Sequence, residues 1–358
     1  MVDWPRHSLT ARIAPGQGTF RRGILDDLPC RRRVVGRGGP CGPELQLAVD
    51  GRLIAQSIWQ STSSTRTDPP ASCLLKQLGA YGALSGVLAV ILGFMSATKH
   101  VVLIHGTWAS GDSWGPARAA FEERGYTVHT PTLRHHELPL EEGAMKIAPL
   151  SMRDYTDDLV ALVDPLDSPP LLVGLSLGGL LAQVVAARTR HAGVVAACPM
   201  TAAGFIPNPT TLRAAVSIFG RHYLQPRPWA KPLYPPTWQR FRRWIANAQT
   251  EETAREFFAD LVCESGRAYC EIGFPYLDRG KATTVNFAAV TRPVLAIRGE
   301  CDRSVPPQVA PWTAARYQGG TYVEIPRSDH LAFSGEALPV TMGHIDDWIA
   351  RDHVLAIA

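Results

Sequence analysis

The sequence predicts an α/β fold: a mostly parallel β-sheet with helices on both faces and a helical cap inserted into it. Short, continuous apolar runs such as HVVLIHG (100–106) and LLVGL (171–175) are typical of strands buried on both faces. Stretches with helical spacing separate these runs, and such an alternation favours parallel strands. The alternation breaks between about residues 201 and 284, where the pattern is helical.

Six strands and four helices are expected outside that break. The strand-like runs cover residues 100–106, 126–133, 171–175, 192–198, 293–299 and 321–326. The helical stretches cover residues 113–125, 154–166, 176–188 and 344–353. Gly125 is expected to end the first helix and Asp154 to cap the second. Because ligands of such sheets lie at the carboxyl ends of the strands, the functional site is expected there.

The break divides the chain into a core and a cap. The core is expected over residues 95–200 and 285–358, and the cap over residues 201–284. The spacing within the cap predicts four helices, over residues 211–223, 237–248, 251–265 and 265–274. A proline-rich connection, QPRPWAKPLYPP (225–236), joins the first two of these helices.

Residues 1–94 are predicted to lie outside this fold. Their first half is rich in Arg, Gly and Pro without periodicity, which is typical of disorder. An Asp-Gly turn supports a hairpin over residues 45–59. The uncharged run 77–98 is long enough to cross a bilayer, although four glycines weaken it as a helix. The favoured interpretation is that residues 1–94 are disordered or precede the native start at Met95; a membrane anchor and a small domain are the alternatives.

Charge and cysteine content exclude several classes of protein. The formal net charge of +4 arises in the first 98 residues, which carry 11 Lys and Arg against 6 Asp and Glu. The remainder is nearly neutral, so no nucleic-acid partner is expected. The seven cysteines are odd in number and form no CxxC or Cys/His cluster, which argues against a disulfide framework or a zinc site. Reduced thiols in a cytoplasmic protein are the simpler interpretation.

A serine stands at the junction between a predicted strand and a predicted helix. In LLVGLSLGGLLAQ (171–183), the segment Gly174-Leu175-Ser176-Leu177-Gly178 fits the pattern G-x-S-x-G. A nucleophile can occupy such a tight, strained turn only if the residues two positions away lack bulk. The turn lifts the hydroxyl above the sheet, near a helix N-terminus. Ser176 is therefore the candidate nucleophile; close strand–helix packing is the alternative reason for the glycines.

A serine hydroxyl needs a base and an orienting acid to act as a nucleophile. After G-x-S-x-G, the acid and then the histidine are expected, each just after a strand. Asp302 follows PVLAIRG and His330 follows TYVEIP, so both occur in that order. Glu300 is the alternative acid. Asp329 adjoins His330 but is expected to point elsewhere, and His344 and His353 are expected on the surface of the last helix.

Two backbone N–H groups must stabilise the negative charge that develops on the substrate oxygen. Leu177, directly after Ser176, is expected to provide one of them. The loop HGTWASGDSW (105–114) is expected to provide the other, from Thr107 first and from Trp108 as the alternative. Trp108 and Trp114 are then expected to line the substrate pocket; ordinary packing against this loop is the alternative.

Four segments together, VVLIHGTW, GLSLGG, RGECDRSVP and PRSDHLAF, resemble the α/β-hydrolase superfamily in motif, order and spacing. The resemblance covers about residues 99–358, apart from the inserted middle. It implies a Ser176–His330–Asp302 triad with Thr107 and Leu177 as oxyanion donors. A serine at the elbow resembles the esterase, lipase, peptidase and C–C hydrolase branches. Haloalkane dehalogenases and epoxide hydrolases use aspartate there, and the absence of an HGGG run disfavours the hormone-sensitive-lipase-like branch.

The predicted cap combines basic and aromatic residues. Residues 201–250 contain seven Lys and Arg and no Asp or Glu, interleaved with Trp229, Tyr234, Trp238 and Trp244. Such a surface suits an anionic substrate or a lipid surface. The favoured alternative is a solvated helix face, partly neutralised by Glu251, Glu252, Glu256 and Asp260.

One further motif, LRHHE (133–137), places His135 and His136 beside Glu137. Adjacent histidines on a loop are expected to be solvated, so no metal site is predicted.

These residues predict a serine hydrolase that cleaves a carboxylic ester through an acyl-enzyme, with no metal or organic cofactor. The expected partner is a small ester or acyl compound, including anionic or lipid-like ones; membrane contact through residues 77–98 is not favoured. Two alternatives stay open. One is another reaction on the same triad: C–C bond hydrolysis, acyl transfer or hydroxynitrile-lyase-like cleavage. The other is a ligand receptor with a vestigial triad.

Overall fold

The computed structural model describes residues 98–352 and 354 of the chain. Four expectations therefore lie outside the described residues: the disorder or later start expected for residues 1–94, the hairpin over 45–59, the bilayer-length run that begins at residue 77, and the place of His353 on the last helix. In the described part, no helix is both long enough and apolar enough to cross a membrane.

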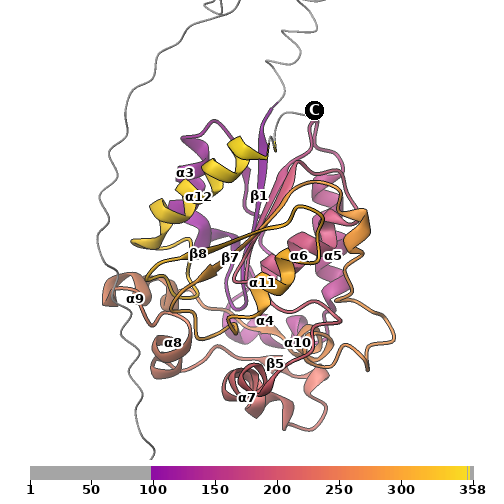
Figure 1. The fold of residues 1–358 in the computed structure, drawn as a ribbon. Coiled ribbons are helices and arrows are strands. Elements are labelled where there is room, and N and C mark those ends of the chain that lie inside the picture. The colour runs from indigo at the N-terminus through magenta and orange to yellow at the C-terminus, as the bar shows by residue number, and fades with distance from the viewer. Residues whose placement is uncertain (1–97, 353, 355–358) are drawn as a thin grey trace, which may run out of the picture. The chain divides into compact units, whose positions relative to one another are not determined.

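Six strands form one sheet in the order β2-β1-β3-β4-β7-β8 (Figure 1). Their bounds are β1 His100–Ile104, β2 Thr127–His129, β3 Leu171–Leu175, β4 Gly193–Ala197, β7 Val294–Gly299 and β8 Thr321–Ile325. All neighbouring strands of this sheet are parallel, which confirms the predicted fold class. Their carboxyl ends consequently meet at one edge.

Helices cover both faces of the sheet, as predicted (Figure 1). One face carries α3 (Gly115–Glu122) and α12 (Ala337–Arg351), and the other carries α5 (Met152–Val163), α6 (Leu177–Ala186) and α11 (Val309–Ala314). Successive side chains of β1 point to opposite faces of the sheet, so this strand contributes to the hydrophobic core on each face. Val101 and Leu103 belong to the core under α3 and α12, whereas Val102 and Ile104 belong to the core under α5 and α6.

Local hydrogen bonds move several boundaries from those that periodicity predicts. Ser151, not Asp154, is the N-cap of α5; Asp154 completes a capping box by accepting the Ser151 N–H at 2.8 Å. Strand β2 pairs over three residues only, and α12 begins at Ala337, two turns before the expected start. Several short helices were not predicted, among them η1 (Gly111–Trp114), α4 (Leu140–Ile147), η3 (Phe287–Ala289) and α11.

Residues 201–284, here called the insertion, lie between β4 and β7. Their elements are α7 (Pro209–Tyr223), η2 (Pro228–Ala230), β5 (Pro232–Leu233), α8 (Trp238–Trp244), α9 (Glu251–Ala259), β6 (Glu264–Ser265) and α10 (Gly266–Gly273). Helix α9 is shorter than expected because the chain beyond it makes other bonds. The Val262 N–H donates to the Trp108 carbonyl oxygen at 2.8 Å, and β6 pairs antiparallel with β5. Figure 1 shows the insertion at the carboxyl edge of the sheet.

Candidate active site

Ser176 stands on a sharp turn between β3 and α6. Its backbone has φ 58° and ψ −114°, a conformation that residues with side chains rarely adopt. A Cβ on Gly174 would lie 2.0 Å from the Gly178 carbonyl oxygen, and a Cβ on Gly178 would lie 2.0 Å from the Ile104 carbonyl oxygen. Only glycine fits at these two positions, for the steric reason that the sequence pattern suggests.

His330 and Asp302 meet at the same edge of the sheet, after β8 and β7. His330 Nδ1 lies 2.9 Å from Asp302 Oδ2. The other carboxylate oxygen, Oδ1, accepts the N–H groups of Ser304 and Val305 at 2.7 and 3.1 Å. These bonds fix the carboxylate, which holds the imidazole with its proton on Nδ1 and leaves Nε2 able to accept one.

Asp302 also governs the charge state of His330. Burial alone lowers the pKa of His330, but the charge and hydrogen bond of Asp302 outweigh burial and raise this pKa above its ordinary value. The negative charge of Asp329 acts in the same direction. His330 is therefore a stronger base than an isolated histidine in such a buried place.

The other acidic and histidine candidates occupy different places. Glu300 is exposed and accepts the Arg327 N–H at 2.8 Å. Asp329 is fully buried and accepts hydrogen bonds from neighbouring backbone and amide groups instead of from the His330 ring. His344 lies half-buried on α12. Of these acids, Asp302 is the one that the structure brings to His330 Nδ1.

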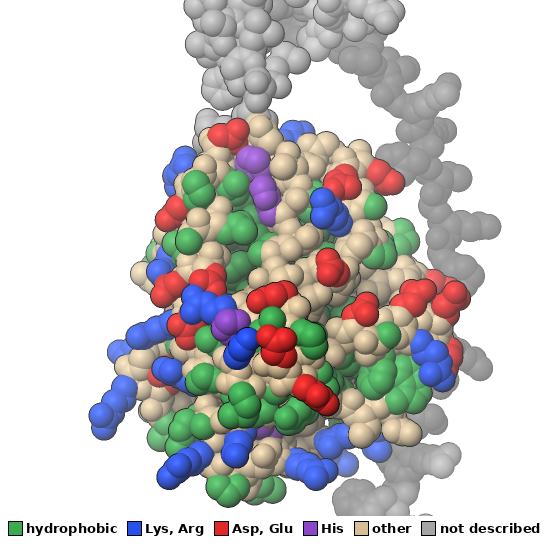
Figure 2. Space-filling view, turned by 180° about the vertical axis from the view of Figure 1, so that it is seen from behind, with side chains coloured by type: hydrophobic (Ala, Val, Ile, Leu, Met, Phe, Trp, Pro, Cys, Tyr) green, Lys and Arg blue, Asp and Glu red, His purple; other side chains and the backbone are tan. Residues whose placement is uncertain are grey.

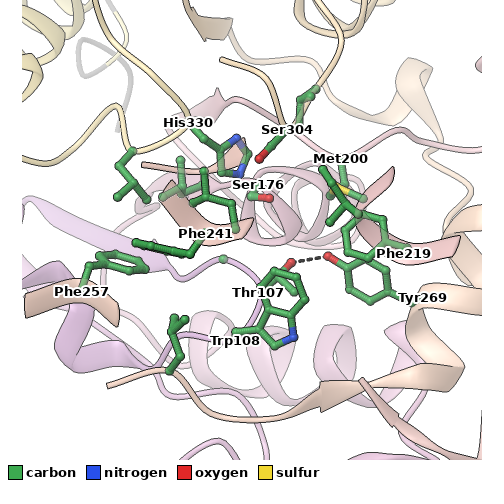
Figure 3. A pocket seen from close by; sticks show the side chains of 17 residues that line it. Thr107, Trp108, Ser176, Met200, Phe219, Phe241, Phe257, Tyr269, Ser304 and His330 are labelled. Atoms are coloured by element: carbon green, nitrogen blue, oxygen red, sulfur yellow. Dashed lines mark hydrogen bonds between the residues drawn. The ribbon is translucent and has the colours of Figure 1, made fainter. Parts of the chain in front are cut away.

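Ser176 and His330 line one cavity with mainly apolar walls (Figure 3). Figure 3 shows the Ser176 side chain beside the His330 ring, with Thr107 and Trp108 across the cavity. Ser304 also lines it, and its hydroxyl donates to the Trp244 carbonyl oxygen at 2.8 Å. The structure thus brings the candidate nucleophile, the candidate base and the loop 105–114, here called the oxyanion loop, to one space.

Trp114 does not line this cavity. Its ring is almost fully buried and packs edge-on against Phe333, with ring centroids 5.0 Å apart. It belongs to the core under α3 and α12. The expectation that Trp114 lines the substrate pocket is corrected accordingly: ordinary packing accounts for it. Trp108 does line the cavity, and its Nε1–H donates to the Leu233 carbonyl oxygen at 3.0 Å.

The two candidate oxyanion donors come from different segments, Leu177 from the start of α6 and Thr107 from the loop after β1. Leu177 is the first residue of α6, so its N–H has no acceptor within the helix. Thr107 follows β1 and lines the cavity. Its hydroxyl is hydrogen-bonded to the Tyr269 hydroxyl of α10 (Figure 3). The insertion therefore contacts the loop after β1 at Thr107, the candidate oxyanion donor.

His105 fixes the start of the oxyanion loop. Its Nε2 accepts the Leu133 N–H at 3.0 Å, so the ring proton is on Nδ1, which donates to the Gly106 carbonyl oxygen at 2.9 Å. Burial and the nearby charge of His136 lower the pKa of His105 to about 3. His105 is therefore a neutral structural group that sets the turn before Thr107.

Seven of the 17 residues that line the cavity come from the insertion, and none of the seven was predicted. The insertion residues that line it are Ile218, Phe219, Phe241, Ile245, Phe257, Leu261 and Tyr269. Two pairs among them, Phe241 with Ile245 and Phe257 with Leu261, are four residues apart. In the helices expected from the sequence, 237–248 and 251–265, this spacing places both members on one face, so it is the sequence signal that could have identified them.

A buried ion pair lies behind the oxyanion loop. His136 Nε2 is 3.2 Å from Glu264 Oε2, and both side chains are buried. The Tyr155 hydroxyl and the Ser265 N–H donate to the other Glu264 oxygen at 2.9 and 2.7 Å. Burial lowers the pKa of His136, but Glu264 outweighs burial and raises it. The expectation of a solvated loop is therefore wrong for His136, whereas His135 is partly exposed.

Among the described residues, one group has the spacing to hold a metal ion: Cys198, Asp302 and His330, whose ligand atoms lie within 4.8 Å of one another. The chemistry of the group does not fit a metal centre. Asp302 already holds His330 Nδ1. Burial and the Asp302 charge raise the pKa of Cys198 well above its ordinary value, so the thiol stays protonated and is a poor ligand.

A comparison with known families agrees with this geometry. A family model described as "Alpha/beta hydrolase family" matches residues 101–338, which include Ser176, Asp302 and His330. The chain belongs to the α/β hydrolase family. No curated protein matches it significantly in sequence.

Several solved structures have a similar fold. A thermophilic esterase from Thermogutta terrifontis is 18% identical with a TM-score of 0.51, over 72% of this chain and 91% of that chain. A pyrethroid hydrolase from Sphingobium faniae is 20% identical with a TM-score of 0.53, over 71% and 99%. An extracellular α/β-hydrolase from a Paenibacillus species is 18% identical with a TM-score of 0.50, over 69% and 98%. At such identities the likeness concerns the fold.

Proposed function

We propose that the protein is a serine hydrolase that cleaves a carboxylic ester through an acyl-enzyme intermediate. One observation carries the proposal: His330, hydrogen-bonded to Asp302 at 2.9 Å, faces the same cavity as Ser176 on its strained turn. Nucleophile, base and orienting acid are the three groups that this chemistry requires. The esterase and hydrolase activities named for similar structures support it.

In the proposed acylation step, Ser176 Oγ attacks the ester carbonyl carbon while His330 Nε2 takes the hydroxyl proton. Asp302 orients the ring and stabilises the imidazolium that forms. The N–H groups of Thr107 and Leu177 stabilise the oxyanion. The tetrahedral intermediate then releases the alcohol, which takes the proton from His330, and the acyl group stays on Ser176.

In the proposed deacylation step, His330 takes a proton from water, and the hydroxide attacks the acyl carbon. The same N–H groups stabilise the second oxyanion, and His330 returns its proton to Ser176 as the acid leaves. No metal or organic cofactor takes part in either step. The insertion acts as the cap, because its apolar side chains line the cavity that holds the acyl group.

Initial-rate hydrolysis of p-nitrophenyl esters from acetyl to palmitoyl tests this function. Ser176→Ala in the full chain is expected to lower kcat/KM by about four to six orders of magnitude, because the nucleophile is gone. The thermal unfolding midpoint should stay close to that of the native protein, because one buried oxygen is removed from a small side chain. The chain-length optimum measures the acyl site.

Ser304→Ala is the matched control. Ser304 lines the same cavity, but its hydroxyl serves the Trp244 carbonyl oxygen, so kcat/KM should stay within about tenfold of the native value. Native-like turnover by folded Ser176→Ala would refute the mechanism. Product analysis distinguishes the other reactions of this triad, because hydrolysis yields the free acid and acyl transfer yields a new ester.

A further inference from the structure

A second cavity lies beside the catalytic one, between the elements of the insertion. Three side chains, Trp108, Ile218 and Ile245, line both cavities. These three apolar side chains form a wall that the two spaces share, so an extended molecule that passes between them reaches both spaces.

The second cavity is basic. Arg221 from α7 and Arg240 from α8 line it, together with the polar Gln225 and Thr237, and no Asp or Glu is among its lining residues. The whole stretch 201–250 contains no acidic residue. On the face drawn in Figure 2, Lys and Arg side chains stand among hydrophobic ones at the end of the molecule that the insertion forms.

The positive charge of this cavity is uncompensated in the described part of the chain. Neither Arg221 nor Arg240 forms an ion pair with a described residue. Arg240 donates through one nitrogen, Nη2, to the Ser217 carbonyl oxygen, which anchors the guanidinium between α8 and α7 and leaves other N–H groups for a ligand. Glu251, expected to neutralise this region, pairs instead with Arg255 on its own helix at 2.6 Å.

We propose that the second cavity binds an anionic group of the substrate, and that the substrate is an ester carrying a carboxylate remote from the scissile bond. This inference rests on the proposed function, because it assigns a substrate class to the Ser176 site. A guanidinium donates paired N–H groups that match the two oxygens of a carboxylate. The apolar wall at Trp108, Ile218 and Ile245 suits an aliphatic spacer between ester and carboxylate.

Mono-p-nitrophenyl esters of dicarboxylic acids, from succinate to sebacate, test the subsite. Each is compared with its ω-methyl ester, which keeps the length and removes the charge. At the best length, kcat/KM for the charged ester should exceed that for its methyl ester by about tenfold or more, mainly through KM. A spacer too short to pass the wall should show no preference.

Arginine variants assign the preference to the cavity. Arg240→Gln should lower the charged-to-neutral ratio by about tenfold, and Arg221→Gln by less, because Arg221 is exposed and more strongly screened. Arg213→Gln is the matched control: Arg213 is an exposed arginine on α7 that does not line the cavity, so its variant should keep the native ratio.

The outcomes separate this inference from the proposed function. Suppose that the methyl esters are hydrolysed. A charged-to-neutral ratio of kcat/KM of one or less, or a higher ratio that Arg240→Gln leaves unchanged, refutes the subsite but not the proposed serine hydrolase. If no ester is hydrolysed, the proposed function fails, and calorimetric titration of suberate into the full chain decides on the subsite alone. Binding weakened by Arg240→Gln but not by Arg213→Gln supports the subsite, and no binding refutes it.

Discussion

At the scale of single residues, local environment assigns different roles to one residue type. Three histidines near the site are buried, yet their pKa values move in opposite directions. His330 and His136 each contact a carboxylate, which raises the pKa despite burial. His105 hydrogen-bonds to backbone groups only, and burial together with the nearby His136 lowers its pKa to about 3. A carboxylate partner therefore distinguishes His330 and His136, whose pKa values are raised, from the neutral, structural His105.

The pH dependence of turnover tests the role of Asp302. In the native enzyme kcat/KM should rise with pH through an inflection above 6.5, because neutral His330 is the base and Asp302 raises its pKa. In Asp302→Asn burial dominates, so the inflection should move to lower pH while kcat falls by about three to four orders of magnitude. Glu300→Gln, which alters an exposed acid nearby, should keep the native profile. An unmoved inflection in Asp302→Asn would contradict this assignment.

Candidate site residues could be predicted from the sequence where a local sequence pattern surrounds them. Ser176 is marked by glycines, which the close backbone approaches at Gly174 and Gly178 require, and Asp302 and His330 are marked by the strands before them. Trp114 carries no such mark. Whether a loop tryptophan faces a cavity or the core depends on its tertiary partner, here Phe333, which is far away in the sequence.

At the scale of elements, the buried strands were predictable because both their faces are apolar. The short elements were not. Helix α11 is six residues long and contains Pro311 in its first turn, and the β5–β6 ladder has two residues on each strand. Such elements exist because of the tertiary contacts around them, and periodicity needs longer segments.

Asp329 connects two elements of the site. It is fully buried and its carboxylate accepts four hydrogen bonds: one from the Leu331 N–H and three from Ala248 and Gln249, between α8 and α9. The loop that carries His330 is thereby tied to the insertion that walls the cavity. Asp329 is a positioning residue, since it acts on the reaction through its neighbours.

Asp329→Asn should loosen this connection. One carboxylate oxygen becomes an N–H₂ group facing N–H donors, so we expect the free energy of unfolding to fall by about 1–3 kcal/mol. Its negative charge also raises the pKa of His330, so the inflection of kcat/KM should shift to lower pH. Urea unfolding and the pH profile measure both effects. Asp347→Asn, on the exposed face of α12, is the control; equal effects in the two variants would refute the positioning role.

At the scale of the whole molecule, buried polar contacts join the insertion to the core. Glu264 of β6 holds His136 and Tyr155, and Glu271 of α10 accepts the Ser151 hydroxyl at 2.8 Å. A buried carboxylate without its partners is strongly destabilising. Separating β6 and α10 from the core would therefore leave buried carboxylates without their hydrogen-bond partners. These contacts keep Tyr269 of α10 hydrogen-bonded to Thr107.

Glu264→Gln should destabilise the protein because it leaves His136 buried without its countercharge. We expect a loss of about 3–5 kcal/mol near pH 6 by urea unfolding. Glu256→Gln, an exposed acid of the same insertion, should change little. A double-mutant cycle with His136→Gln isolates the pair, and the coupling should be a large part of the single-variant effect.

The loss of stability in Glu264→Gln should also depend on pH, and the pKa shifts of His136 and Glu264 determine the direction of this dependence. His136 has a raised pKa, so its stabilisation is complete below the unfolded value of 6.5 and is lost as pH rises through the folded value. Glu264 has a lowered pKa, so its stabilisation is complete above the unfolded value of 4.5 and is lost as pH falls through the folded value. The pair therefore contributes most to stability between the two unfolded pKa values, 4.5 for Glu264 and 6.5 for His136. The destabilisation by Glu264→Gln should therefore shrink from pH 6 to pH 9; a loss that grows over this range would show that His136 and Glu264 are not an ion pair in the folded protein.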